Sequence, residues 1–282
     1  MTPFDLGLIA FPVLLVLILI RIPIMVAMFC VGVLGQYLVF GNWIPIVAQM
    51  KSLSFSTFSS YSLSVVPMFL LMGQFASRGG LSKALFDAAH KMVGHRRGGL
   101  ALSTIAACGG FGAICGSSLA TAATMGQVAL PELRKHGYSD RLSTAVLAAG
   151  GTLGVLIPPS VVLVIYAILT EQNIAKLFVV AFVPGFLAVL GYMITVSVMV
   201  RLGGEQETQS ERATWPERKK ALRDIWPVAA IFALVIGGIY GGWFTPTEGA
   251  AVGAGATGLL AYLNGGLDRQ SFEDALLETA SA

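Results

Sequence analysis

Long stretches without a single charged residue are the feature that most constrains this chain. A helix needs about 20 apolar residues to cross the hydrocarbon core of a bilayer. Only 12% of the 282 residues are charged and 55% are hydrophobic, whereas soluble domains carry about 25% charged residues. The sequence therefore predicts an all-α polytopic membrane protein and excludes a soluble enzyme, a nucleic-acid binder and a disordered chain. The charge-free runs are 6–20, 22–50, 52–77, 98–131, 142–170, 177–200, 225–247 and 249–267.

Turn residues divide these runs into expected helices. Gly41-Asn42-Trp43 ends a span near residue 40, and we expect the Ser-rich stretch 52–64 to be a polar loop or an interfacial segment. Residues 201–224 are charged and form the expected cytoplasmic linker. The first part, 1–200, has these expected segments: helices at about 4–20, 22–40 and 62–77, a hairpin over 98–133, a broken helix over 142–170 and a helix over 175–200. Residues 225–282 are expected to form two helices and an amphipathic tail that lies on the membrane face, with Leu267, Phe272, Ala275, Leu276 and Thr279 at helical spacing.

The distribution of basic residues predicts how the chain crosses the membrane. Lysine and arginine accumulate on the cytoplasmic side. Most of them fall in five clusters, which are Arg21, 78–97, 134–141, 201–223 and Arg269. If all five are cytoplasmic, the N-terminus is periplasmic and the tail at 282 is cytoplasmic. Residues 98–131 then lie between two cytoplasmic clusters but are too few for two full spans. We therefore predict a re-entrant helical hairpin that turns at Cys115–Ser118.

The segment over 142–170 is expected to cross the membrane once, yet the residues at its centre disfavour an α-helix. Pro158 and Pro159 remove two backbone donors and restrict the residues before them. Gly150, Gly151 and Gly154 weaken the helix further. We expect a broken transmembrane helix, with half-helices over about 142–151 and 160–170 joined by an unwound strip.

Two interruptions at one depth point to a cation site. Unwound backbone in hydrocarbon is tolerated where it lines a cavity or binds something, and discontinuous helices hold cations in secondary transporters. No acidic residue or histidine lies in the middle of a span, which favours Na⁺ bound by oxygen over protons. The hydroxyls that could contribute are Ser117, Ser118, Thr121 and Thr152. The alternative is close helix packing through Gly112-x-x-x-Gly116 and Gly150-x-x-x-Gly154.

Other classes of site find little support. We expect no catalytic residue, no organic cofactor and no metal beyond Na⁺, because the three cysteines lack paired metal-ligand spacing and no phosphate-binding loop is present. An intramembrane hydrolase that uses Ser117 or Cys115 would need a base at the same depth, and the sequence offers none there.

Three strings resemble the large membrane subunit of TRAP (tripartite ATP-independent periplasmic) transporters. They are Cys115-Gly-Ser-Ser-Leu-Ala-Thr-Ala-Ala-Thr-Met-Gly126, Pro131-Glu-Leu133 and Gly151-Thr-Leu-Gly-Val-Leu-Ile-Pro-Pro-Ser160. Val66-Pro-Met-Phe69 through Gly73 and Thr245-Pro-Thr-Glu-Gly-Ala250 also fit that family. The resemblance runs along essentially the whole chain.

This resemblance implies an elevator-type, Na⁺-coupled importer of organic acids, such as C4-dicarboxylates and sialic acid, in the bacterial inner membrane. Its implied partners are a small four-helix membrane subunit and a periplasmic substrate-binding protein. Carried over by position, the residues implied to hold Na⁺, largely through backbone, are Cys115, Gly116 and Ser117 on one side and Gly154, Ile157 and Pro159 on the other. Ser118 and Thr121 are implied as hydroxyl contacts to ion or substrate. Many relatives are expected to have serine at position 115, so a side-chain role there is doubtful.

The order of elements also predicts an inverted repeat. The first helix runs inward, whereas the helix after the linker runs outward. The second repeat is incomplete, because it lacks a hairpin and a broken helix, so the chain is expected to be short by about a third. It is then a fragment, a truncated gene product or a piece of a split subunit. The alternative function is a non-transporting structural subunit that binds the small membrane subunit.

Overall fold

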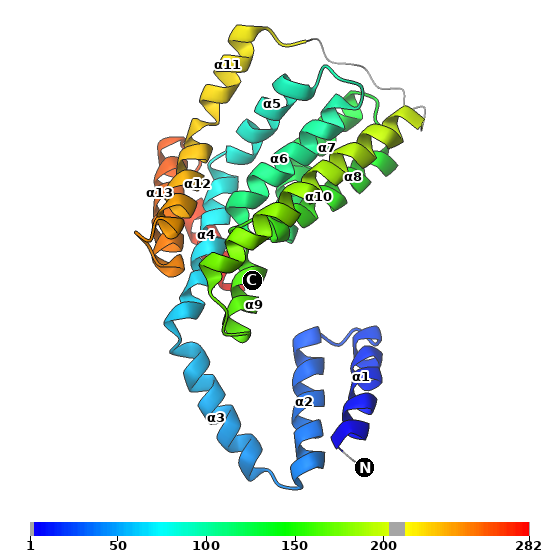
Figure 1. Cartoon of the computed structure of the whole chain (residues 1–282), viewed down its shortest axis with the longest axis vertical. Helices are drawn as coiled ribbons and strands as arrows, with labels where there is room; N and C mark the ends of the chain where they lie inside the picture. Colours follow the sequence, from blue (N-terminus) through cyan, green and yellow to red (C-terminus); the bar gives the residue numbers. More distant parts are fainter. Residues whose placement is uncertain (1–2, 203–211, 282) are drawn as a thin grey trace. The chain divides into compact units, whose positions relative to one another are not determined.

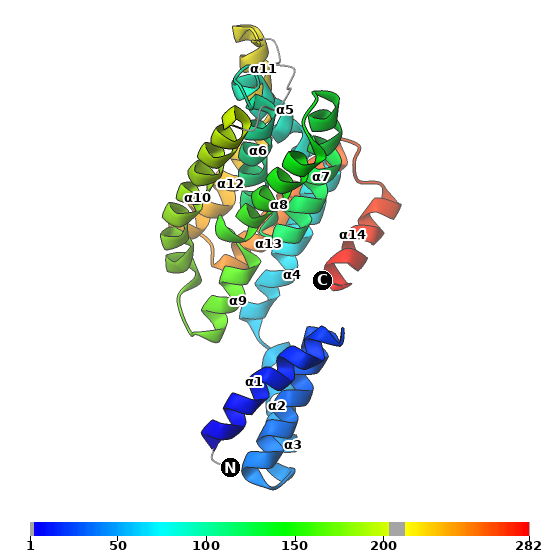
Figure 2. The same ribbon diagram turned by 90° about the vertical axis from the view of Figure 1, so that its right-hand side faces the viewer.

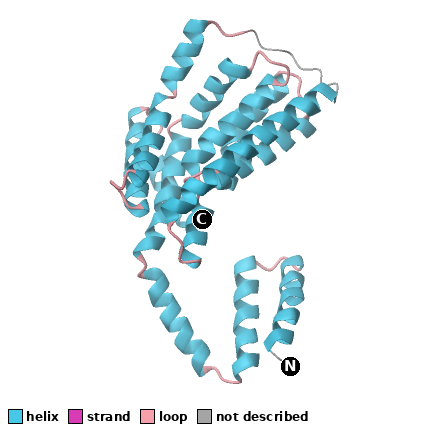
Figure 3. Ribbon diagram, viewed as in Figure 1, coloured by secondary structure: helices cyan, strands magenta, loops and turns pink. Residues whose placement is uncertain are grey.

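The computed structural model describes residues 3–202 and 212–281 and consists of helices joined by short loops (Figure 3). No strand occurs within these two ranges. The predicted all-α class is therefore confirmed. The chain divides into two compact units, 1–60 and 61–282.

The first unit contains three helices. They are α1 (Pro3–Leu19), α2 (Ile24–Phe40) and α3 (Ile44–Phe58). Within this unit α1 and α2 lie side by side (Figures 1 and 2). The left-handed Gly41 ends α2 (φ +64°), and Tyr37 stacks on Trp43 with ring centroids 4.5 Å apart. Most large apolar side chains of the unit are exposed, as expected of helices that face lipid or another protein.

The Ser-rich stretch differs from the expected polar loop, because α3 continues as helix to residue 58. Serine in a helix can bond the carbonyl one turn earlier instead of disrupting it. Ser56 does so, since its hydroxyl donates to the Leu53 carbonyl at 3.1 Å. A loop is therefore wrong for residues 52–58, whereas an interfacial position for this helix stays a prediction.

The second unit is larger and has a buried core. Its elements are η1 (Tyr61–Ser64), α4 (Val65–Arg78), α5 (Leu81–Val93), α6 (Gly99–Cys115), α7 (Ser118–Lys135), α8 (Asp140–Leu156), α9 (Val161–Leu169), α10 (Ile174–Leu202), α11 (Trp215–Asp224), α12 (Trp226–Tyr240), α13 (Pro246–Leu263) and α14 (Arg269–Ser281). Helix α6 lies at the centre and contacts α4, α5, α7, α8 and α10. Fifteen of its 17 residues are buried. The core also includes Phe69, Phe111 and Phe178, with Phe69 and Phe178 6.4 Å apart between ring centroids.

Part of the expected linker 201–224 is helical. Residues 203–211 lie outside the described ranges. Helix α11 begins with a capping box, in which the Glu217 carboxylate accepts from the Thr214 amide at 2.7 Å and from its hydroxyl at 2.8 Å. Helix α12 follows after a bend of 44°. The sequence argument did not predict α11, although Thr214-Trp-Pro-Glu217 has the pattern that starts a helix.

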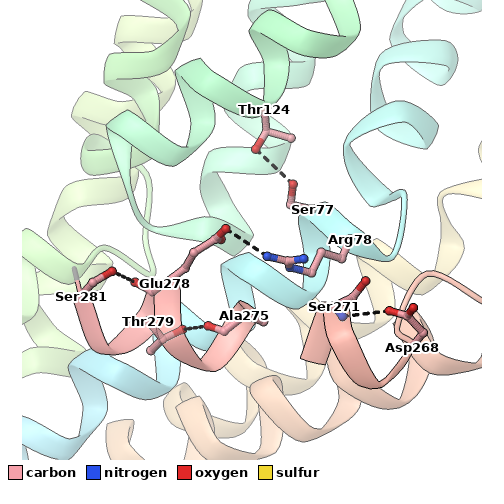
Figure 4. Close-up of polar contacts among 9 residues, drawn as sticks. All are labelled: Ser77, Arg78, Thr124, Asp268, Ser271, Ala275, Glu278, Thr279 and Ser281. Atoms are coloured by element: carbon pink, nitrogen blue, oxygen red, sulfur yellow. Dashed lines mark hydrogen bonds and ion pairs between the residues drawn. The ribbon is translucent and has the colours of Figure 1, made fainter. Parts of the chain in front are cut away.

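The amphipathic tail is a helix, α14, and it docks on α4 (Figure 4). Phe272 stacks on Phe75 with ring centroids 5.9 Å apart, and Ala275 is fully buried. The Arg78 guanidinium lies 3.1 Å from the Glu278 carboxylate. Part of the apolar face expected on the membrane therefore covers another helix. Ala282, the last residue of the expected tail, lies outside the described ranges.

By length and composition, one helix of the described residues, α10, could cross a membrane unaided. If each bent pair of helices counts as one span, the number rises to at most four. Helices α1, α2 and α6 are apolar but shorter, at 17 residues each, which is the lower end of the range of about 17–25 residues for a membrane helix.

Candidate functional site

The first half of the candidate site is the turn between α6 and α7. Helix α6 ends at Cys115, and Gly116 adopts φ +64°, where its amide donates to the Gly112 carbonyl at 2.9 Å. Only glycine adopts this left-handed conformation at little cost. Ser117 is extended, and its hydroxyl accepts from the Ala120 amide at 3.4 Å, so that it caps α7. The hairpin thus turns where the sequence predicts.

The second half is the interruption between α8 and α9, which are bent by 42°. Helix α8 ends at Leu156, Ile157 is extended, and α9 starts at Val161. Ser160 is buried and caps α9, since its hydroxyl accepts from the Leu163 amide at 3.3 Å. The first half-helix is longer than the predicted 142–151, because helix continues past the glycines to residue 156.

These two interruptions contact each other directly through main-chain atoms, and we call this contact the junction (residues 115–117 with 154–161). The Val161 amide donates to the Gly116 carbonyl at 3.2 Å. A Cβ on Gly116 would lie 2.7 Å from the Pro159 oxygen. A Cβ on Gly112 would lie 2.7 Å from the Gly154 Cα. The glycine packing considered as an alternative is therefore present, and it brings the proposed cation ligands together.

Gly154 faces the start of α7. A Cβ at this position would lie 2.5 Å from Thr121 Oγ1 and 2.7 Å from the Ser117 oxygen. Thr121 is fully buried, and its hydroxyl donates to the Ser117 carbonyl at 2.7 Å. One threonine hydroxyl and one carbonyl thus converge on the bare backbone of α8, which only glycine allows.

The junction is rich in oxygen atoms that carry partial negative charge. Proline has no amide hydrogen, so Pro158 and Pro159 deprive the carbonyls of Gly154 and Val155 of their helical donors. Helices α6 and α8 both end here, and a helix C-terminus carries about half a negative charge. Helices α7 and α9 both begin here, with their first amides partly satisfied by Ser117 and Ser160. Such an arrangement is suited to a small hard cation, which prefers oxygen ligands.

The other predicted residues occupy different places. Ile157 can contribute only its main chain, because its side chain lies against Gly109 and Gly185. Cys115 places its sulfur against Gly73 of α4, 2.8 Å from where a Cβ would be. Ser118 is the first residue of α7 and is partly buried.

Thr152 lies away from the junction. Its hydroxyl is 3.0 Å from the Tyr192 hydroxyl of α10 and donates to the Ala149 carbonyl at 2.7 Å. The structure therefore does not bring Thr152 together with the other candidate residues. Sequence reasoning also missed the approach of Gly73 to the hairpin, although the segment from Val66 to Gly73 carried part of the resemblance.

The junction has no chemistry of its own that suits covalent catalysis. The Ser117 hydroxyl has a structural partner, the Ala120 amide. Within residues 3–202 and 212–281, no three His, Cys, Asp or Glu side chains group in a way that could hold a metal ion. What the junction offers is main-chain oxygen and the capping hydroxyls of Ser117 and Ser160, with the buried Thr121 hydroxyl beside it.

Comparison with known proteins agrees with this architecture. Residues 11–282 match the family described as "Tripartite ATP-independent periplasmic transporter, DctM component". The chain is 41% identical over 202 residues to the C4-dicarboxylate TRAP transporter large permease protein DctM of Pseudomonas aeruginosa, covering 71% of this chain and 46% of the relative. It is 37% identical over 209 residues to the protein of that name from Vibrio cholerae, covering 74% of this chain and 46% of the relative.

A third relative is named for a different substrate. The chain is 34% identical over 239 residues to the ectoine TRAP transporter large permease protein TeaC of Halomonas elongata, covering 83% of this chain and 54% of the relative. The chain thus spans about half the length of the curated relatives it matches. These relatives are transporter permeases and not enzymes. Taken together, the matches and the fold show that the chain belongs to the DctM-component family of the tripartite ATP-independent periplasmic transporters.

Proposed function

We propose that this chain forms the first repeat and the start of the second repeat of the large subunit of a Na⁺-coupled importer of organic acids. The observation that carries the proposal is the junction, where the Ser117 carbonyl and the Thr121 hydroxyl lie against Gly154 and the Gly116 carbonyl meets the start of α9. The named substrates of two relatives, C4-dicarboxylate and ectoine, support a small organic solute. The helix N-termini of α7 and α9 at the same place would favour a carboxylate beside the cation.

The proposed ligands of Na⁺ are Cys115, Gly116 and Ser117 on the hairpin and Gly154, Ile157 and Pro159 on the broken helix. The Gly116 carbonyl already accepts from Val161, so it has one lone pair left for an ion. Thr121 and Ser118 would contribute hydroxyls to ion or substrate. The predicted contribution of Thr152 is not part of this proposal, because Thr152 bonds to Tyr192.

The proposed assembly follows the family. A small four-helix membrane subunit would brace the large subunit, and a periplasmic binding protein would deliver the substrate. The large subunit would move its hairpin and broken helix as an elevator in the bacterial inner membrane, with the N-terminus periplasmic and residue 282 cytoplasmic. The chain then provides the first of two inverted repeats (1–200) and the start of the second (225–282), and a second hairpin would complete the ion and substrate sites.

The test is uptake by the complete transporter in proteoliposomes. A form that contains the second half and both partners should accumulate a labelled C4-dicarboxylate or another organic acid when an inward Na⁺ gradient is imposed. Equal uptake with a proton gradient in Na⁺-free buffer would contradict the coupling ion. Uptake by the 282-residue chain without a second half would contradict the division of the site between two repeats.

A non-transporting structural subunit that binds the small membrane subunit is the second candidate. It predicts stable binding of the small membrane subunit without any Na⁺-dependent change in the protein. Na⁺-dependent protection of the junction from hydrogen exchange, absent in K⁺, would favour the ion site over this alternative.

A further inference from the structure

Two basic segments that are far apart in the sequence meet in the second unit. Helix α5 contacts α11 (Figure 1). Residues 81–97 and 212–224, which we call the basic corner, contain nine lysines and arginines but only three acidic residues. The basic residues are Lys83, Lys91, Arg96, Arg97, Arg212, Arg218, Lys219, Lys220 and Arg223, and the acidic ones are Asp87, Glu217 and Asp224.

The acidic residues do not neutralise the corner evenly. A cavity of about 260 Å³ between α5 and α11 is lined by both Asp87 and Asp224 together with Lys83 and Lys91, so charges of both signs are present there. The Glu217 carboxylate is held by Thr214 at the start of α11. The surplus positive charge therefore lies at the other end of the corner, toward the turn after α5.

The guanidinium of Arg218 lacks hydrogen-bond partners. Its Nε and Nη2 atoms are enclosed and have no hydrogen-bond partner among the described residues. A guanidinium in this state costs more than one in water, because charged donors lose hydration without replacement. An anion that reached the corner would restore those bonds, and a phosphate oxygen pair matches the geometry of the guanidinium.

His95 is a second residue of the basic corner whose side chain lacks a hydrogen-bond partner. Its Nδ1 atom is also enclosed and has no partner within the described ranges. Partial burial lowers the pKa of His95, and the positive charges of Arg218, Arg212 and Arg96 lower it further. Four basic side chains from two segments thus converge on one spot, and an anion is the ligand such a spot binds.

The surroundings indicate a lipid headgroup as the source of that anion. Trp215, the first residue of α11, is 71% exposed, and Trp226, the first residue of α12, is 63% exposed. Exposed tryptophan is enriched at the level of lipid headgroups. Helix α11 is polar and bends by 44° from the apolar α12, so α11 need not continue the direction of α12 into the membrane.

We propose that the basic corner is a binding site for an anionic phospholipid, whose headgroup phosphate contacts Arg218 and His95. Anionic lipids attract basic segments near a membrane surface with about 1 kcal/mol per basic residue. The site is separate from the junction, and it requires neither Na⁺ nor a transported solute. It would hold α11 against α5 through a bridging lipid.

The test uses the intact chain purified in mild detergent and placed in nanodiscs of phosphatidylglycerol and phosphatidylcholine. Native mass spectrometry should show phosphatidylglycerol retained in preference to phosphatidylcholine. Arg218→Gln should reduce that retention about tenfold, which corresponds to about 1.4 kcal/mol. The matched control is Arg141→Gln, which removes the same charge from an exposed residue of α8 outside the basic corner and should change retention about twofold or less.

Several outcomes would overturn the proposal. They are equal retention of the two lipids, an equal loss in both variants, or displacement of the lipid by inorganic phosphate at millimolar concentration, which would assign the site to a soluble anion. A second measurement guards against misfolding of the variant. In the unmodified chain, phosphatidylglycerol should raise the pKa of His95 relative to phosphatidylcholine, as followed by its ring chemical shifts, because a bound anion stabilises the protonated ring. An unchanged pKa would also overturn the proposal.

Discussion

Glycines set how closely the two interruptions approach. Gly112 and Gly154 bring α6 and α8 into main-chain contact, and Gly116 does the same for the hairpin turn and Pro159. At each of these positions an added methyl group would overlap backbone atoms, which cannot move aside as a flexible side chain can. Space, and not only backbone flexibility, therefore explains glycine at 112 and 154.

Replacing Gly154 with alanine should destabilise the second unit by about 1–3 kcal/mol, because the methyl group would collide with Thr121 Oγ1 and the Ser117 carbonyl. Gly126 is the matched control, since it lies in α7 with open space around it. Gly126→Ala should be neutral or stabilise by up to about 1 kcal/mol through helix propensity. Thermal unfolding in detergent measures both, and equal effects of the two changes would contradict this account of the junction.

His90 of α5 predicts a dependence of stability on pH. Burial lowers its pKa below the ordinary value, nearby His136 and Lys91 lower it further, and Asp87 and Glu132 partly oppose this. The unfolded chain therefore binds more protons than the folded one as the pH falls below about 6.5. The contribution of neutral His90 to stability is present above that pH and is lost below it.

The expected result is a fall in apparent Tm between about pH 7.5 and about pH 5.5 that is smaller in His90→Gln than in the unmodified chain. Thermal unfolding across this range in one detergent measures it. A variant whose Tm falls as steeply as that of the unmodified chain would show that another group is responsible.

Among the helices, α14 shows how a short polar element is held (Figure 4). Its ion pair, Arg78 with Glu278, is partly exposed, with side chains 21% and 54% accessible, and such pairs contribute about 0–1 kcal/mol. The stacking of Phe272 on the buried Phe75 removes apolar surface from water and should contribute more.

Phe272→Ala should therefore loosen α14 more than Glu278→Gln does, and both should exceed Leu277→Ala, whose side chain is 67% exposed. Hydrogen exchange of residues 269–281 in the intact chain measures the effect. We expect faster exchange by up to about tenfold for Phe272→Ala, equivalent to about 1.4 kcal/mol. An equal effect of Leu277→Ala would show that α14 is not held through this face.

Sequence predicts those elements whose cause is local. Gly116 and Ser117 turn the hairpin, and Pro158-Pro159 interrupts the next helix, so both features follow from residue chemistry alone. The extension of α8 to Leu156 does not, because Gly150, Gly151 and Gly154 remain helical where they pack against neighbouring helices.

Other features depend on contacts between distant segments, which no local pattern reveals. Thr152 looked like a ligand by its position near the interruption, but a partner 40 residues later, Tyr192, decides where it points. The contact of Gly73 with Cys115 is of the same kind. The candidate site was therefore predictable as a pair of interruptions, whereas the side on which each residue lies was not.

For the chain as a whole, the prediction concerns which helix ends of the second unit lie on the same side of the membrane. Lys83 and Glu132 line one cavity of about 360 Å³ between α5 and α7, and Lys135 lies 3.8 Å from Glu132. Leu100, the second residue of α6, lines the same cavity as Glu132, near the end of α7. The start and the end of the hairpin are thus neighbours, and Lys83 lies beside them.

Cysteines introduced at Lys83 and Lys135, in a chain freed of its own cysteines, should react alike with an impermeant maleimide. Both should be protected in intact spheroplasts and labelled in inverted vesicles, since basic segments stay in the cytoplasm. Labelling of the two positions from opposite sides would contradict the predicted re-entrant hairpin, and with it the predicted inverted repeat.

The bond from the Val161 amide to the Gly116 carbonyl has a consequence for divergence within the family. Both atoms belong to the main chain. Apart from proline at 161, and a side chain at 116 that would collide with the Pro159 oxygen, substitutions in the surrounding sequence do not delete the bond. This hydrogen bond between the hairpin and α9 can therefore persist while the surrounding sequence diverges. Relatives that transport different solutes can keep the same main-chain hydrogen bond while the residues that contact the solute differ.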